Sequence, residues 1–225
     1  MSVTASNIKT VLFDLDGTLV DTAPDLANAL NTVLAEEGRE PAPYERIRAE
    51  ASYGGKALVA MGFGIKETDA DFERLRRRFL QRYADNICVE SKLFEGMEAV
   101  LSHIEHNHRN WGVVTNKPSY LTDPLMQALG LTQRAACIVS GDTTGKSKPD
   151  PAPMHYACEL SGARVAECVY IGDAQRDIEA GSRAGMRTLA ASFGYLKNDD
   201  DPLSWNADFV VAHPREIIEW LQQHG

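Results

Sequence analysis

The 225-residue sequence has no long apolar run, no internal repeat and no low-complexity segment. A membrane-spanning helix needs about 20 consecutive apolar residues, and no stretch approaches that length. The opening residues 1–9, MSVTASNIK, also lack the basic start and the apolar stretch of a signal peptide. We therefore expect a protein that is neither exported nor inserted into a membrane.

Cysteine is scarce as well. The four cysteines are Cys88, Cys137, Cys158 and Cys168, and they show no CxxC spacing. Each lies beside apolar neighbours, as a small core residue would. We expect a reduced, cytoplasmic protein.

Positive charge is also in short supply. The chain has 23 lysines and arginines against 32 aspartates and glutamates, which gives a formal net charge of −9. A nucleic-acid surface needs a basic stripe that neutralises phosphates, so no nucleic-acid partner is expected. A small anionic substrate would need local positive charge or a metal ion in its site.

What is present is the composition of a soluble globular protein, with 44% apolar and 24% charged residues. After residue 91, helical patterns alternate with short strand-like runs. These runs cover residues 111–115, 135–140, 168–173, 188–192 and 207–211. Such alternation predicts a parallel sheet with helices on both faces.

The segment between residues 22 and 90 reads differently, because it holds helical patterns and no convincing strand. Within it, the sequence SYGGK at residues 52–56 is expected to break the helices, and Gly62 to Gly64 to form a turn. We predict an α/β fold with a Rossmann-like, three-layer parallel-sheet core and an inserted all-helical cap domain. The core would comprise residues 1–20 and 91–225, and the cap residues 21–90.

Two aspartates follow the first strand-like run, at residues 11–13. In an extended segment Asp14 and Asp16 project to the same side, and Gly17 then permits a sharp turn. Two carboxylates so close repel each other unless a cation such as Mg²⁺ lies between them. We interpret Asp14 as a nucleophile that attacks phosphorus and Asp16 as its general acid and base. An acidic surface turn is the alternative.

Ligands of an open parallel sheet bind beyond the carboxyl ends of its strands. Polar groups expected at those ends are Asp14 with Asp16, Thr115 with Asn116, Lys148 in SKPDP, and Asp173 with Asp177 in GDAQRD. Singly, each could be a helix cap or a solvated charge. Their joint occurrence in this order favours a single catalytic site.

With these motifs the sequence resembles the haloacid dehalogenase-like superfamily of phosphatases over nearly its whole length. DLDGT is similar to its first motif, Thr115 to its second, Lys148 to its third, GDAQRD to its fourth, and the helical insert to its cap. The resemblance implies an aspartyl-phosphate on Asp14 and a magnesium ion held by Asp14, the backbone carbonyl of Asp16, and Asp173. It also implies that Asp177 acts just behind these ligands, and that Thr115, Asn116 and Lys148 bind the phosphoryl oxygens.

An acid at Asp16 favours a phosphomonoester, since the dehalogenases of this superfamily lack it. The opening DLDGTLVDTAPDL and the sequence KPDP resemble the phosphoglycolate phosphatase subfamily. SKLFEGM, WGVVTNKP and ADFVVAHP are more similar to a branch that hydrolyses N-acetylmuramic acid 6-phosphate in cell-wall recycling. We expect a cap loop to select the substrate, because a cation there could meet the carboxylate that both compounds carry. Its residues are Ser52, Gly54, Gly55 and Lys56.

Other interpretations remain at this point. The cap loop could be a flexible turn with Lys56 in solvent. A phosphomutase would differ only in passing the phosphoryl group to a sugar hydroxyl instead of water. GDTTGKS at residues 141–147 resembles a P-loop, but that motif needs a glycine where Ser140 stands. The expected partner is a small anionic phosphomonoester, and the expected assembly is a monomer or a homodimer.

Overall fold

The computed structural model describes residues 7–224. Residues 1–6, part of the segment from which we expected no export signal, lie outside the described residues. Across the described range, no helix combines the length and apolarity that crossing a membrane requires.

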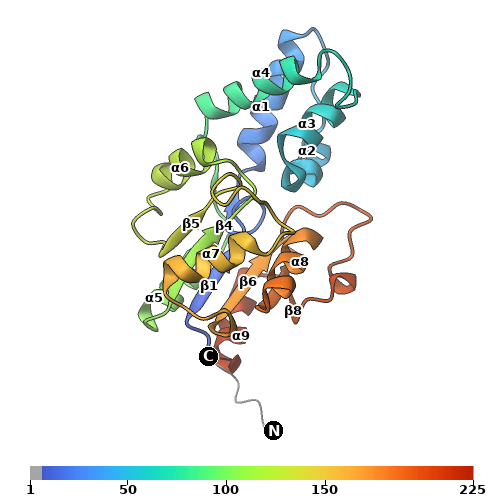
Figure 1. The fold of residues 1–225 in the computed structure, drawn as a ribbon. Helices are drawn as coiled ribbons and strands as arrows, with labels where there is room; N and C mark the ends of the chain where they lie inside the picture. Colours follow the sequence, from blue (N-terminus) through green and yellow to red (C-terminus); the bar gives the residue numbers. More distant parts are fainter. Residues whose placement is uncertain (1–6, 225) are drawn as a thin grey trace.

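Within residues 7–224, six parallel strands form the central sheet in the order β5-β4-β1-β6-β7-β8 (Figure 1). The strands are β1 (Thr10–Phe13), β4 (Asn110–Val114), β5 (Cys137–Val139), β6 (Cys168–Gly172), β7 (Arg187–Ala191) and β8 (Phe209–Val211). Phe13 of β1 is in register with Val113 of β4 and with Ile171 of β6. The end of β1 is therefore flanked by the ends of β4 and β6.

Apolar residues of β1 point alternately into two helical layers. The helices of the core are α5 (Met97–His106), α6 (Ser119–Ala128), α7 (Ala152–Ser161), α8 (Gln175–Ala184) and α9 (Pro214–His224). Val11 and Phe13 pack with residues of α5, α6 and α9, whereas Leu12 packs on the opposite face with residues of α7 and α8. The predicted α/β fold with a three-layer core is confirmed.

Four helices lie apart from the sheet, at the top of Figure 1. They are α1 (Ala23–Glu36), α2 (Tyr44–Glu50), α3 (Gly54–Phe63) and α4 (Phe72–Asp85). Their apolar residues form a cluster of their own, which also takes in Leu121 and Tyr195 of the core. A two-residue antiparallel ladder of β2 (Val20–Asp21) with β3 (Lys92–Leu93) joins this helical unit to the core. The boundaries given above for the cap stay a prediction.

The cap loop differs from what its glycines suggested. Residues Ala51–Tyr53 form a single 3₁₀ turn and α3 begins at Gly54, so Lys56 is helical. Gly62, expected in a turn, lies inside α3. A Cβ on Gly62 would come within 3.0 Å of the buried Leu30 side chain of α1. The glycine signal here reflects close helix packing, which outweighs the low helix propensity of glycine.

Candidate active site

Asp14 lies at the centre of the site because β1 is a central strand. Its main-chain N–H donates to Ile171 O at 2.8 Å, which continues the pairing of β1 with β6. Its Oδ1 accepts from the main-chain N–H of Leu15 at 2.7 Å and lies 2.8 Å from Lys148 Nζ. Burial raises the pKa of Asp14, and the charge of Lys148 acts against that rise.

Lys148 is the cation among the acids, and its side chain is only 1% exposed. Its Nζ also lies 2.7 Å from Asp177 Oδ1 and donates to Val114 O at 3.1 Å. Asn116 holds the main chain of Lys148: its Nδ2 donates to Lys148 O at 3.0 Å, and Lys148 N donates to its Oδ1 at 2.9 Å. The Asn116 side chain thus holds Lys148, while its main-chain N–H is left for a phosphoryl contact.

Asp14, Asp173 and Asp177 form a buried carboxylate cluster, in which one oxygen of each lies within 4.8 Å of one oxygen of the other two. Burial raises the pKa of Asp173 to about 7, and the charges of Asp14 and Asp177 add to the rise. Oxygen ligands are those that Mg²⁺ prefers, and its charge would offset the repulsion within the cluster. The residues therefore fit the magnesium ion expected from the sequence.

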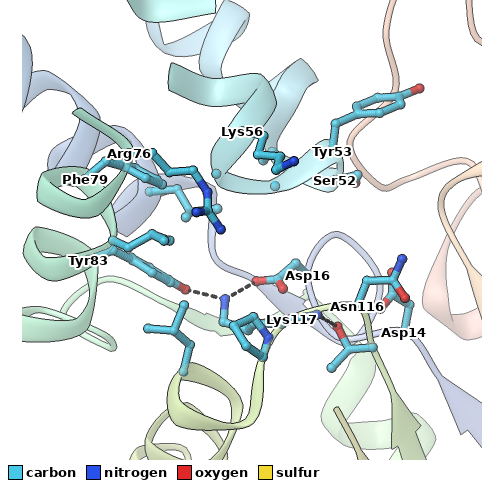
Figure 2. A pocket seen from close by; sticks show the side chains of 18 of the residues that line it. Asp14, Asp16, Ser52, Tyr53, Lys56, Arg76, Phe79, Tyr83, Asn116 and Lys117 are labelled. Atoms are coloured by element: carbon cyan, nitrogen blue, oxygen red, sulfur yellow. Dashed lines mark hydrogen bonds and ion pairs between the residues drawn. The ribbon is translucent and has the colours of Figure 1, made fainter. Parts of the chain in front are cut away.

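Asp16 lies outside this carboxylate cluster and has contacts of its own. Its Oδ1 accepts from Thr22 Oγ1 at 2.6 Å and from Lys117 Nζ at 2.8 Å. Lys117 Nζ also donates to Tyr83 Oη of α4 at 2.8 Å, so this lysine links Asp16 to the cap (Figure 2). Burial lowers and the Asp16 carboxylate raises the pKa of Lys117, with a net rise, so the ammonium group stays charged.

Thr115 follows β4 and is buried. Its main-chain N–H donates to Val139 O at 2.9 Å, and its Oγ1 accepts from the main-chain N–H of Lys117 at 3.1 Å. Among the described residues its hydroxyl hydrogen has no acceptor, so the hydroxyl can donate to a phosphoryl oxygen.

The cap loop reaches the carboxylate cluster directly. Ser52 Oγ donates to Asp173 Oδ2 at 2.6 Å, and the guanidinium of Arg176 donates to Ser52 O at 2.6 Å. Lys56 lies farther out, where its Nζ is 2.7 Å from Glu67 Oε2 and both side chains are more than half exposed. The four loop residues therefore do not share one environment.

A cavity of about 450 Å³ lies between cap and core (Figure 2). The predicted site residues that line it are Asp14, Asp16, Ser52, Gly54, Gly55, Lys56, Thr115 and Asn116. Lys148, Asp173 and Asp177 do not line it, and are buried in contact with Asp14 or beside it. The roles of these residues stay predictions.

Sequence reasoning missed several polar cavity residues, among them Tyr83, Lys117 and Arg176. Lys117 and Arg176 stand inside motifs already singled out, NKP and GDAQRD, and their charge was the available signal. Tyr83 had none, because it contacts Lys117 only through the packing of α4 over the core.

The glycine-rich segment 141–147 forms turns after β5, and α7 begins only at Ala152. A P-loop needs a helix directly after its lysine, since the helix N-terminus binds the phosphates. This geometry argues against a P-loop at residues 141–147.

Known proteins resemble this chain along nearly its whole length. The family model for haloacid dehalogenase-like hydrolases matches residues 11–191. An N-acetylmuramic acid 6-phosphate phosphatase of Pseudomonas putida is 45% identical over 93% of this chain and 94% of its own length. A phosphoglycolate phosphatase of Xanthomonas campestris pv. campestris is 41% identical over 94% of this chain and 95% of its own.

The same fold occurs in the crystal structure of a predicted phosphoglycolate phosphatase from Haemophilus somnus 129pt, with a TM-score of 0.84 and 26% identity. The match covers 96% of this chain and 98% of the other. These findings confirm the resemblance read from the motifs and the expectation of an enzyme. The chain belongs to the haloacid dehalogenase-like hydrolase family.

Proposed function

We propose that this protein is a Mg²⁺-dependent phosphatase that hydrolyses a small phosphomonoester through an aspartyl-phosphate on Asp14, with N-acetylmuramic acid 6-phosphate as its favoured substrate. One observation carries the proposal. Asp14 combines a buried ion pair with Lys148 and a face open to the cavity between cap and core. That arrangement suits phosphoryl transfer, which depends mainly on positioning and on neutralising charge.

In the first step, Asp14 attacks phosphorus. Its Oδ1 is bound by Lys148 and by the Leu15 N–H, whereas its Oδ2 has no donor among the described residues. Oδ2 is therefore the attacking oxygen: it bonds to phosphorus while the bond from phosphorus to the ester oxygen breaks. That oxygen leaves with a proton from Asp16.

In the second step, water attacks the phosphorus of the aspartyl-phosphate and gives a proton to Asp16. The bond from phosphorus to Asp14 Oδ2 breaks, and inorganic phosphate leaves. Asp16 can serve both steps because Thr22 and Lys117 hold only its Oδ1, which leaves Oδ2 for the substrate or for water. Thr115 Oγ1 and the Asn116 N–H bind the transferring group.

A magnesium ion held by Asp14, the backbone carbonyl of Asp16, and Asp173 would neutralise charge on the phosphoryl oxygens. Asp177 orients Lys148 through their 2.7 Å ion pair, and Asn116 fixes the main chain of that lysine. These two contacts keep the ammonium group of Lys148 against Asp14 throughout the reaction.

The cavity supports an amino-sugar phosphate over phosphoglycolate. Its volume lies in the usual range for sites that enclose a whole small molecule. Phe79, Leu80 and Leu121 give it an apolar wall, which suits the face of a sugar ring. Phosphoglycolate, the second candidate because of the Xanthomonas relative, would fill only a small part of this space.

The proposal is tested by phosphate release from N-acetylmuramic acid 6-phosphate, phosphoglycolate and glucose 6-phosphate, with Mg²⁺ and with a chelator. We expect the first compound to give the highest kcat/KM, and the chelator or Asp14→Asn to abolish turnover. Hydrolysis that survives both treatments would refute the mechanism. Transfer to a second sugar without free phosphate would identify a phosphomutase instead.

A further inference from the structure

Four cationic side chains appear among the described residues that line the cavity: Lys56, Arg76, Lys117 and Arg176. Two of them have tasks at the catalytic end. Lys117 binds Asp16 and Tyr83. Arg176 donates to Ser52 O; burial lowers its pKa and the charges of Asp177 and Asp14 raise it, with a net rise. Of these four, only Lys56 and Arg76, both on cap helices, remain to contact the part of a substrate that lies farthest from its phosphate.

These two cations differ in what already neutralises them. Lys56 is a single ammonium group that lies 2.7 Å from Glu67. Arg76 contacts Glu73 through Nη1 alone, at 3.1 Å, and Glu73 is 59% exposed. A guanidinium carries five N–H donors in a planar fork, so most of the donors of Arg76 stay available within the described structure. In Figure 2 this group points from α4 into the space above Asp16.

No acidic side chain of the described cap residues lines the cavity. The only carboxylates among the described lining residues are Asp14 and Asp16, and both belong to the core. An arginine that keeps most of its donors free at the wall of a cavity favours an anion there, and its fork matches a carboxylate through two parallel hydrogen bonds.

We propose that Arg76 is the residue that recognises the carboxylate of the substrate. This inference rests on the proposed function and deepens it. In N-acetylmuramic acid 6-phosphate the lactyl carboxylate hangs from O3 and the phosphate from O6, so the ring separates the two anionic groups by several bonds. With the phosphate at Asp14 in the core, the carboxylate meets the cap at Arg76. In phosphoglycolate the two anionic groups are too close together to use both walls.

The test compares two sugar phosphates that differ in the recognised group. N-acetylglucosamine 6-phosphate has a hydroxyl in place of the whole O-lactyl group, its carboxylate included, and is otherwise the same ester. We expect Arg76→Met to lower kcat/KM for N-acetylmuramic acid 6-phosphate about 10- to 100-fold, mainly through KM. The loss on N-acetylglucosamine 6-phosphate should be small, so the ratio of the two kcat/KM values falls.

Arg77→Met is the matched control, because Arg77 is the next residue on α4, is exposed, and does not line the cavity. Its ratio should equal that of the wild type. An unchanged ratio in Arg76→Met would overturn the inference, as would a larger fall in Lys56→Met. If the wild-type protein hydrolysed both sugar phosphates equally well, this inference would also be overturned, but the proposed phosphatase function would stand. Release of phosphate from neither ester would contradict the proposed function itself.

Discussion

At the scale of single residues, Lys117 is the point where the proposed general acid meets the cap. Its side chain is 7% exposed and lies between Asp16 Oδ1 and Tyr83 Oη. Without it, Thr22 alone would fix the Asp16 carboxylate. We expect Lys117→Met to lower kcat about 10-fold or more for a sugar phosphate, whose leaving oxygen needs a proton. The loss should be much smaller for p-nitrophenyl phosphate, whose leaving group needs none.

The kcat values for the two esters, measured side by side, check this prediction. Tyr83→Phe is the control, because it removes the hydroxyl on the cap side and leaves the contact between Lys117 and Asp16. It should affect both esters alike. If Lys117→Met also lowered both equally, Lys117 would only support the structure.

A comparison of residues in the site shows how far a sequence can predict such a site. Asp14, Thr115 and Asp173 were found because each directly follows a buried strand, and parallel strands end at one edge. Tyr83 could not be found, since it lies 34 residues from Lys117 along the chain. A contact of that kind depends on how a cap helix packs, which no local pattern encodes.

At the scale of elements, the end of β6 and the start of α8 approach too closely for a side chain at Gly172. A Cβ there would lie 2.3 Å from the Cβ of Asp177. Because Asp177 is fully buried against Lys148, it has no space into which to retreat. We expect Gly172→Ala to displace the Asp177 carboxylate and to lower kcat/KM at least about 10-fold.

Gly181→Ala is the comparison for Gly172→Ala. Its Cβ would meet Thr188 Cγ2 of β7 at 2.5 Å, so it also strains the packing of α8, but away from the carboxylates. Thermal melting should show that both variants are destabilised. Activity per folded molecule should fall only in Gly172→Ala, and an equal fall in both would contradict the assignment.

Glycine also explains one element predicted wrongly here, the turn expected from Gly62 to Gly64. Gly62 and Gly172 are the same residue type, yet one allows two cap helices to touch and the other a strand and a helix. At Gly62 only the position of Leu30, 32 positions earlier in the chain, could have separated a packed helix from a turn.

At the scale of the whole molecule, the cap touches the core on both sides of the cavity. On one side Ser52 contacts Asp173, and Lys197 Nζ lies 2.9 Å from Glu50. On the other side Tyr83 contacts Lys117. These contacts hold the cap against the core, and the cavity between the two is partly open. Asp14 is buried beneath them, and its low exposure to water strengthens its electrostatic interactions.

The buried carboxylates give the whole molecule a pH-dependent stability. The pKa of Asp173 is about 7 in the folded chain, against about 3.9 for an unperturbed aspartate. Between these values the folded state keeps a proton that the unfolded state loses, so metal-free stability falls as the pH rises through this window. Above pH 7 the cluster is more fully ionised and binds Mg²⁺ more tightly.

We therefore expect Mg²⁺ to raise the melting temperature more at pH 8 than at pH 5, which thermal melts with and without the ion will check. Asp173→Asn is the control, because it removes both the titrating group and a ligand. In that variant the metal-dependent rise should shrink at pH 8, and the fall in metal-free stability between pH 4 and pH 7 should weaken. A rise that is equal at both pH values in the wild type would mean that the ion does not bind at these carboxylates.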